Sequence, residues 1–257
     1  MSVQAASVDP AEIERFSALS AEWWNPVGSF RPLHKFNPVR LGFVRDAVAG
    51  HFGRDPLNES PLGDSPLAGL RLLDIGCGGG LVSEPMARLG ASVIGVDASE
   101  KNIGVARHHA AESGLEIDYR CNAAEELVAA GERFDVILAL EVVEHVADPA
   151  GFCRALGQML KPPSAGYPGG ILVAATLNRT PKAYALAIVG AEYILRWLPA
   201  GTHDWKKFLK PHELAKLLRD ASLSVTQVAG ASYAPLSERW TISRDTDVNY
   251  LMVAVKR

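Results

Sequence analysis

The sequence predicts an α/β fold of the Rossmann-like type, built on a seven-stranded mixed sheet with six parallel strands and one antiparallel strand. Three observations lead to this prediction. Short apolar segments alternate with helix-like segments from about residue 70 onward, a glycine-rich turn at 76–80 follows the first apolar segment, and two strand-like segments, 223–230 and 248–256, close the chain. Such apolar runs are typical of parallel strands buried on both faces, and a strand, a glycine turn and a helix are typical of nucleotide-binding α/β folds.

Composition and charge narrow the class of protein. The 257 residues carry a net charge of −3 and no basic tract, so we expect no nucleic-acid partner. Cys77, Cys121 and Cys153 do not have the spacing of a structural metal site, and their odd number favours a reducing compartment. The N-terminal residues lack the apolar core of a signal peptide, and no uninterrupted apolar run reaches the ~18 residues of a membrane span.

We interpret the chain as one domain with three parts. Asp9 and Pro10 predict the start of a first helix. The aromatic segment 23–40 is too rich in proline and glycine for a helix, so we expect it either to fold over a pocket as a lid or to pack at the domain edge, and a second helix to begin after Pro38. The parts are an N-terminal helical lid at 1–53, a linker-like loop at 54–69 and a ligand-binding core at 70–257.

The turn after the first strand indicates the ligand. Asp74, Gly76 and Gly78 depart from the dinucleotide fingerprint, because Leu81 stands where its third glycine would be. Glycines there allow a ligand to approach the main chain, where a Cβ would intrude. Asp97 ends the second strand, and its carboxylate can accept hydrogen bonds from both ribose hydroxyls. These residues suit a nucleoside with a cationic centre, S-adenosylmethionine (SAM), better than they suit a pyrophosphate.

The core continues in the same alternation. Ser99 is the expected N-cap of a helix that ends at Gly114. Leu140 ends the fourth strand beside the pocket, and Arg40 could present its guanidinium to a ligand carboxylate. Further strands are expected at 117–121, 134–140 and 170–175, and a further helix at 149–160.

Several motifs together resemble one family. They are Trp-Trp-Asn-Pro-x-Gly at 23–28, Asn-Pro-x-Arg at 37–40, Leu-Leu-Asp-Ile-Gly-Cys-Gly-Gly-Gly at 72–80, Leu-Asn-Arg-Thr at 177–180, Val-Gly-Ala-Glu-Tyr at 189–193, Gly-Thr-His-Asp at 201–204 and Asp-Val-Asn-Tyr at 247–250. With these motifs the chain resembles the ubiquinone biosynthesis O-methyltransferases from about residue 11 to 255. It departs from their pattern at Asn25, where Asp is more usual, and in longer loops at 54–69 and 161–170.

The resemblance implies an enzyme, a SAM-dependent O-methyltransferase acting on a hydroxyl of a polyprenylated phenol or quinol. The implied acceptors are 2-polyprenyl-6-hydroxyphenol and 3-demethylubiquinol, and a complex of ubiquinone-pathway proteins is an implied partner. Related methyltransferases contact adenine at the position of Ala123. Two alternatives stay open: a SAM-dependent methyltransferase of another small apolar or phenolic acceptor, and a SAM-binding, membrane-associated protein without catalysis.

Transfer to a phenol needs help with proton removal, because a phenol of pKa about 10 is mostly neutral at neutral pH. Glu141, Glu144 and His145 follow the fourth strand, and they share one face if a helical turn begins at Glu141. They could hold Mg²⁺, a metal that the resemblance also implies, or His145 could act as the base beside Glu141. Alternatively the acids only favour a helix N-terminus and His145 packs locally. His34 and His203 are further candidates on the substrate side.

Residues 183–199, within a substrate insertion at 177–210, are strongly apolar and aromatic, and Lys206, Lys207 and Lys210 follow them. Such a segment can lie in a membrane interface, or it can pack over the core or at a dimer contact. Because the resemblance implies an acceptor held in lipid, we expect a cytoplasmic protein peripherally associated with the inner face of the membrane.

Overall fold

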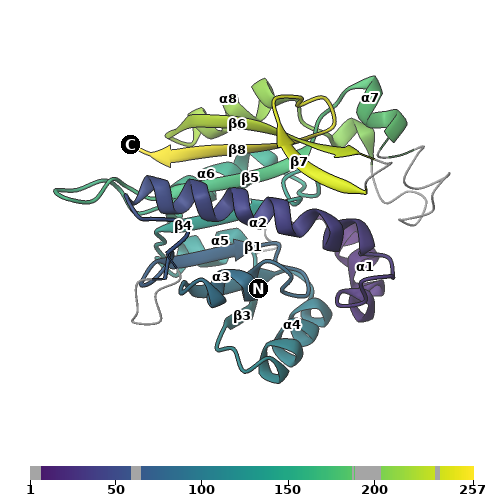
Figure 1. The fold of residues 1–257 in the computed structure, drawn as a ribbon, viewed down its shortest axis with the longest axis horizontal. Helices are drawn as coiled ribbons and strands as arrows, with labels where there is room; N and C mark the ends of the chain where they lie inside the picture. Colours follow the sequence, from purple (N-terminus) through teal and green to yellow (C-terminus); the bar gives the residue numbers. More distant parts are fainter. Residues whose placement is uncertain (1–6, 59–64, 187, 189–203, 235–237) are drawn as a thin grey trace.

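The computed structural model describes residues 7–58, 65–186, 188, 204–234 and 238–257. In this part of the chain one eight-stranded sheet has the order β3-β2-β1-β4-β5-β8-β6-β7 (Figure 1). The strands are β1 (Arg71–Ile75), β2 (Ser92–Asp97), β3 (Asp118–Cys121), β4 (Val136–Leu140), β5 (Ile171–Leu177), β6 (Leu223–Ala234), β7 (Arg239–Ser243) and β8 (Asn249–Lys256).

The seven predicted strands are confirmed. β1 to β5 pair in parallel, β8 is antiparallel to β5, and β6 is antiparallel to β8, so that β6 runs in the same direction as β1 to β5. The predicted count of seven was one too low. β6 continues to Ala234, and the extension pairs with β7, from Gly230 opposite Ser243 to Ala234 opposite Arg239.

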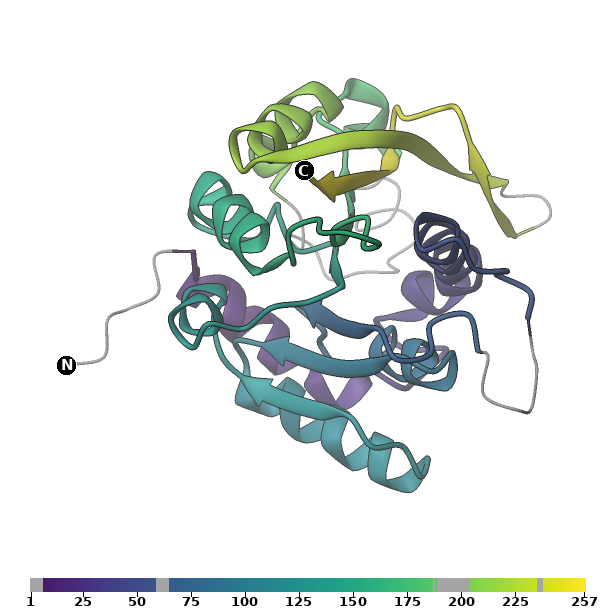
Figure 2. The same ribbon diagram turned by 90° about the vertical axis from the view of Figure 1, so that its left-hand side faces the viewer.

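Helices cover both faces of the sheet (Figure 2). One face carries α2 (Arg31–His51), α3 (Ser83–Arg88) and, toward the outer strands, α4 (Glu100–Glu112). The other face carries α5 (Ala124–Ala129), α6 (Pro149–Met159) and α8 (Pro211–Asp220). The remaining helical segments are α1 (Pro10–Ala18), η1 (Ser20–Glu22), α7 (Pro181–Ala183) and η3 (Trp205–Lys207).

The central strands fill both layers of the core. Leu72 and Leu138 point toward the α2 face, whereas Leu73 and Ile137 point toward the α6 face, and all four are fully buried. Burying one such side chain stabilises the fold by about 1.5–3 kcal/mol. This two-sided burial is why the strands read as continuous apolar runs.

Helix α2 corrects one prediction. It begins at Arg31, eight residues before the expected start, and it contains Pro38 in its interior. An interior proline removes a backbone hydrogen bond and costs about 3 kcal/mol in an isolated helix. Burial of Phe36, Phe43 and Val44 against the sheet offsets this cost, so tertiary packing decides the conformation of the segment.

Parts of two predicted segments lie outside the described residues: 59–64 of the linker-like loop, and 187 and 189–199 of the apolar segment, together with His203. The second half of the loop is not a solvated linker, because Leu67 is fully buried. At the start of the apolar segment, Tyr184 and Leu186 are exposed. None of the described helices is both long and apolar enough to cross a membrane.

Candidate functional site

The glycine turn adopts a backbone conformation that favours glycine, but protein side chains, and not a ligand, lie against it. Gly76 and Gly78 have φ of +74° and +54°, the left-handed region that favours glycine. A Cβ at Gly76 would lie 2.7 Å from Cγ2 of Val142, and one at Gly78 would lie 2.3 Å from Cζ2 of Trp23. We expected a ligand to make these close approaches. In the structure protein side chains make them, because the indole of Trp23 lies directly on the turn.

Asp97 is anchored at the end of β2. Its carboxylate accepts hydrogen bonds from the backbone N–H of Gly78 at 3.0 Å and of Ser99 at 2.9 Å, and from Nδ2 of Asn102 at 3.2 Å. Burial raises the pKa of Asp97, and these hydrogen bonds oppose that rise. A carboxylate offers about four acceptor positions, so Asp97 retains acceptor capacity for a ligand.

Asp74 and Arg40 are two buried ionisable residues behind the glycine turn. Ser83 Oγ donates to Oδ2 of Asp74 at 2.6 Å, and burial raises the pKa of Asp74 to about 6. Arg40 donates to Oδ1 of Asn37, and its Nε is buried without a hydrogen-bond partner. Burial lowers the pKa of Arg40, whereas the nearby carboxylates of Glu141 and Asp74 raise it. The guanidinium thus opposes the rise in pKa of the two buried carboxyl groups at the ends of β1 and β4.

A cavity of about 160 Å³ lies between the carboxyl ends of β1 and β2 and helix α1. Arg40, Asp74, Leu140 and Glu144 are not among its lining residues, and Leu140 instead packs in the core on the α2 face. The predicted site residues that line the cavity are Gly76, Gly78, Asp97, Ala123, Glu141 and His145. Wall residues that sequence reasoning did not single out include Glu12, Phe16 and Asn102.

The aromatic segment covers the glycine turn. Trp23 stacks on Phe30 with ring centroids 3.9 Å apart, and its Nε1 donates to Oδ1 of Asn102 at 3.0 Å. Trp24 donates to the carbonyl of Gly79 at 2.8 Å. His34 lies 2.9 Å from the carbonyl oxygen of Trp23 through Nε2, so it supports the covering segment and is not on the cavity wall.

The predicted helical turn at Glu141 is wrong. Glu141 has φ of +55°, and the residues that follow form non-helical turns. Burial, followed by repulsion from Glu144, raises the pKa of Glu141, while Arg40 opposes the rise. Oε1 of Glu141 and Oε2 of Glu144 are both buried without a hydrogen-bond partner among the described residues.

His145 faces helix α1. Its Nδ1 lies 3.1 Å from Oε2 of Glu12, and its ring meets Phe16 edge-on with centroids 5.0 Å apart. Burial raises the pKa of Glu12, but His145, Lys207 and Arg15 outweigh it and lower that pKa to about 2. Within the described ranges no three His, Cys, Asp or Glu side chains form a group that could hold a metal. The arrangement therefore does not fit the predicted Mg²⁺ set of Glu141, Glu144 and His145.

A family model described as a methyltransferase domain matches residues 73–173. The ubiquinone biosynthesis O-methyltransferase of Parvibaculum lavamentivorans is 58% identical over 249 residues, which cover 97% of this chain and 94% of that protein. The protein of the same name from Mesorhizobium japonicum is 58% identical over 251 residues, covering 98% of this chain and 96% of that protein.

The chain belongs to the ubiquinone biosynthesis O-methyltransferase family. It is accordingly a SAM-dependent methyltransferase, as the glycine turn and Asp97 had indicated. The magnesium protoporphyrin IX methyltransferase of Synechocystis, solved with bound SAH, has the same fold, with a TM-score of 0.56, 21% identity and 85% of each chain covered. A SAM-dependent methyltransferase of Thermotoga maritima gives a TM-score of 0.58 at 19% identity, covering 96% of this chain and 100% of that one.

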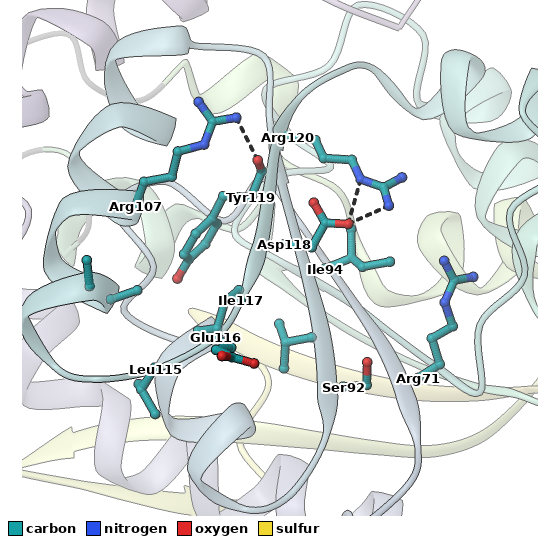
Figure 3. A pocket seen from close by; sticks show the side chains of 13 residues that line it. Arg71, Ser92, Ile94, Arg107, Leu115, Glu116, Ile117, Asp118, Tyr119 and Arg120 are labelled. Atoms are coloured by element: carbon teal, nitrogen blue, oxygen red, sulfur yellow. Dashed lines mark hydrogen bonds and ion pairs between the residues drawn. The ribbon is translucent and has the colours of Figure 1, made fainter.

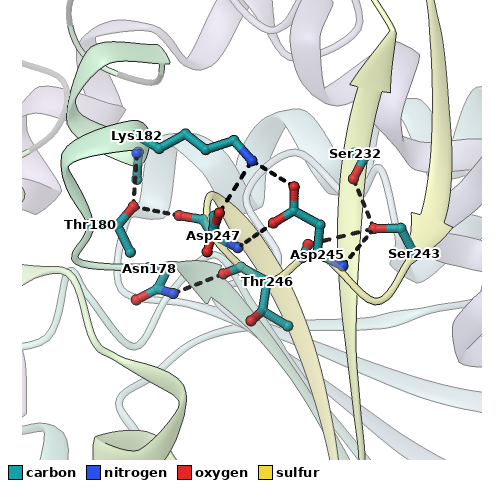
Figure 4. A network of polar contacts seen from close by, with 9 residues as sticks. Asn178, Thr180, Lys182, Ser232, Ser243, Asp245, Thr246 and Asp247 are labelled. Carbon is teal, nitrogen blue, oxygen red and sulfur yellow. Dashed lines mark hydrogen bonds and ion pairs between the residues drawn. The ribbon is translucent and has the colours of Figure 1, made fainter.

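The Leu-Asn-Arg-Thr motif of this family member fixes the start of the insertion (Figure 4). Asn178 Nδ2 donates to the carbonyl of Thr246 at 2.8 Å, and Thr180 Oγ1 donates to that of Asp247 at 2.6 Å. Lys182 pairs with Asp245 at 2.6 Å and with Asp247 at 3.3 Å. These contacts hold the chain that leaves β5 against the loop before β8.

A larger cavity of about 670 Å³ opens beside β2 and β3 (Figure 3). Its three arginines all have partners: Arg107 donates to the carbonyl of Tyr119 at 2.8 Å, while Arg120 and Arg71 pair with Asp118 and Glu132, respectively. Arg107 also pairs with Glu100 at 3.3 Å, so all three positive charges are compensated within the protein, and we assign no ligand to this cavity.

Proposed function

We propose that this chain transfers a methyl group from SAM to a phenolic hydroxyl of a polyprenylated phenol or quinol in ubiquinone biosynthesis. The observation that carries the proposal is the 58% identity over nearly the whole chain to enzymes of that name. The acceptors that we propose are 2-polyprenyl-6-hydroxyphenol and 3-demethylubiquinol.

We assign the methyl donor to the cavity under α1, because the residues on its wall match the chemical groups of the donor. When bound, SAM supplies an electrophilic methyl group on a sulfonium. Asp97 would accept hydrogen bonds from the ribose hydroxyls, because its carboxylate lies on the wall and has acceptor capacity left. Glu141, also on the wall and with an unpartnered oxygen, suits a cationic group of the ligand. Ala123 would contact the adenine. Arg40 is not on the wall, so we propose that it acts through Asp74 and Glu141 by offsetting their charge.

His145 would take the phenolic proton as the hydroxyl oxygen bonds to the methyl carbon and the carbon–sulfur bond of SAM breaks, which would leave S-adenosylhomocysteine. It lies on the cavity wall, as a base must to reach a bound acceptor. Helix α1 and Trp23 close the same cavity, and they would exclude water and hold the reacting groups in line. No step in this mechanism uses a metal, because the described residues do not assemble the predicted ligand set.

We further propose that residues 183–199 bring the enzyme to the cytoplasmic face of a membrane. Tyr184 and Leu186, at the start of this segment, are 48% and 56% exposed, so two large apolar side chains face solvent where the segment begins. An acceptor with a polyprenyl tail is held in lipid, and an interfacial segment would place the cavity beside it. A complex of ubiquinone-pathway proteins remains a prediction.

A turnover assay tests the proposal. Purified protein is incubated with SAM and short-chain forms of the two acceptors, and the products are analysed by mass spectrometry. We expect one added methyl group on at least one acceptor. SAM binding without any methylated product would favour a non-catalytic protein, and turnover only with other phenols would favour a different acceptor. Loss of turnover with EDTA, restored by Mg²⁺, would show that metal ligands assemble on binding.

A further inference from the structure

The contact between Glu12 and His145 joins two segments that are 133 residues apart in the chain. Both side chains line the cavity, and they are only 12% and 15% exposed. Phe16, one helical turn further along α1, packs against the same imidazole. Helix α1 therefore touches the proposed base with a carboxylate and an aromatic ring.

The carboxylate of Glu12 is held at both oxygens. Oε2 faces Nδ1 of His145 at 3.1 Å, while Oε1 accepts from the ammonium of Lys207 at 3.1 Å. Lys207 also donates to Asp9, the N-cap of α1, at 3.0 Å. Arg15, one turn further along α1, also pairs with Oε2. With a cation on each oxygen and the imidazole on Oε2, the carboxylate is restrained from rotating away from the ring.

The helix that carries Glu12 is itself fixed to the core. Just before α1, the backbone N–H and Oγ of Ser7 donate to the two carboxylate oxygens of Glu125, at 3.0 and 2.9 Å. The N–H of Ala147, two residues after His145, donates to the carbonyl of Ser7 at 2.9 Å. The backbone near His145 and the backbone before Glu12 therefore form one unit, so the contact does not depend on a loose N-terminus.

The contact has a defined hydrogen-bond direction. An ionised carboxylate only accepts hydrogen bonds, so the proton between the two groups belongs to Nδ1 of the imidazole. In a neutral imidazole with a proton on Nδ1, the lone pair is on Nε2, on the opposite edge of the ring. Nε2 is then the nitrogen in the correct state to take a proton.

We propose that Glu12, secured by Lys207, is a positioning residue that fixes the tautomer and orientation of His145 from helix α1. This deepens the proposed function, since it rests on His145 acting as the base. Lys207, which holds the other oxygen of Glu12, lies in the insertion at 177–210, so the position of the imidazole depends on contacts from both α1 and the insertion.

Kinetics of Glu12 variants test the proposal. We expect Glu12→Ala to lower kcat about 10- to 100-fold with little change in calorimetric SAM affinity. Glu12→Gln should lose less, because its carbonyl oxygen still accepts from Nδ1. Lys207→Met, which leaves α1 unchanged in sequence, should lower kcat in the same direction by a smaller factor. The matched control is Glu14→Ala, an exposed carboxylate on the same helix, which should keep wild-type kcat.

Two further measurements separate positioning from general damage. In a His145→Ala background, Glu12→Ala should add less than about a twofold loss, because it acts through the missing ring. Nitrogen NMR of His145 should show the Nδ1–H tautomer in the wild type and a tautomer mixture in Glu12→Ala. Losses that multiply in the double variant, a tautomer unchanged by Glu12→Ala, or a kcat for Glu12→Ala equal to that of Glu14→Ala would each overturn the proposal.

The same variants and measurements distinguish a failure of this proposal from a failure of the proposed function. If the wild type methylates neither acceptor, or if His145→Ala keeps full kcat, then the proposed reaction or the proposed base is wrong. The NMR measurement does not need turnover, so it would still decide whether Glu12 sets the state of His145.

Discussion

Nε1 of Trp23 donates to Oδ1 of Asn102 at 3.0 Å, and Asn102 in turn donates to Asp97. The indole that covers the glycine turn is thus fastened, through one amide, to the carboxylate proposed for the ribose. Closure of the N-terminal segment and anchoring of the methyl donor therefore share one hydrogen-bonded chain.

Replacing the indole tests this link. Trp23→Phe removes the donor and keeps an aromatic ring over the turn, so we expect SAM affinity to fall about 2- to 10-fold, the effect of one hydrogen bond. Calorimetric titration measures it. Trp240→Phe is the matched control, because Trp240 packs against Phe36 and Tyr233, outside the cavity. Equal affinities for the wild type and Trp23→Phe would contradict the link.

Two glycines separate backbone strain from crowding at the turn. Gly78 and Gly114 both have positive φ, but nothing lies within 4 Å of a Cβ at Gly114, whereas Trp23 is 2.3 Å from one at Gly78. We expect Gly114→Ala to cost about 1–2 kcal/mol of unfolding free energy from strain. Gly78→Ala should lower the unfolding free energy by about 1–3 kcal/mol more, because of overpacking, and it should also weaken SAM binding. Denaturant unfolding measures both variants, and equal losses would show that the indole does not press on the turn.

Asp74 predicts a pH effect on stability. Burial raises its pKa from 3.8 to about 6 in the folded protein. The stability of the folded state is therefore unaffected by this group below the unfolded pKa, falls as pH rises through about 6, and stays lower above it. Asp74→Asn removes the ionisation, so its stability relative to the wild type should improve by on the order of 3 kcal/mol between about pH 4 and about pH 7. Denaturant titrations without SAM measure it, and a difference independent of pH would contradict the buried position.

Exposed leucines test the membrane proposal. Leu186 lies at the start of the apolar segment and is 56% exposed, and Leu57, 68% exposed, lies in the loop after α2. In flotation with vesicles of mixed anionic and zwitterionic lipid, Leu186→Asp should lower the bound fraction, because a charge is costly in the interface. Leu57→Asp should float like the wild type. Equal flotation of both variants would favour packing of the segment on the protein.

Much of the fold follows from local sequence. Buried apolar runs mark β1, β4 and β5, and Ser99 caps α4 through the N–H of Asn102, as predicted. Helix α2 was partly missed, since the burial that outweighs Pro38 depends on the sheet it meets. β7 was missed because Arg239–Ser243 alternates weakly, with Ile242 and other side chains exposed at the sheet edge.

The site was predicted less completely than the fold. Gly76, Asp97 and His145 could be found because each lies at or just after the end of a strand that is visible in the sequence. The contact of His145 with Glu12 spans 133 residues, so no spacing rule reveals it. The helical turn assumed for Glu141 failed because that residue adopts positive φ, which the sequence spacing alone does not disclose.

The most direct test of the account is the atom that receives the methyl group. SAM carrying a ¹³C-labelled methyl group is incubated with this enzyme and a mixture of short-chain 2-polyprenyl-6-hydroxyphenol and 3-demethylubiquinol, and the products are examined by carbon NMR. We predict that the label appears as a methoxy carbon, bonded to the ring oxygen. A label on a ring carbon, or label that stays on SAM although SAM binds, would contradict it.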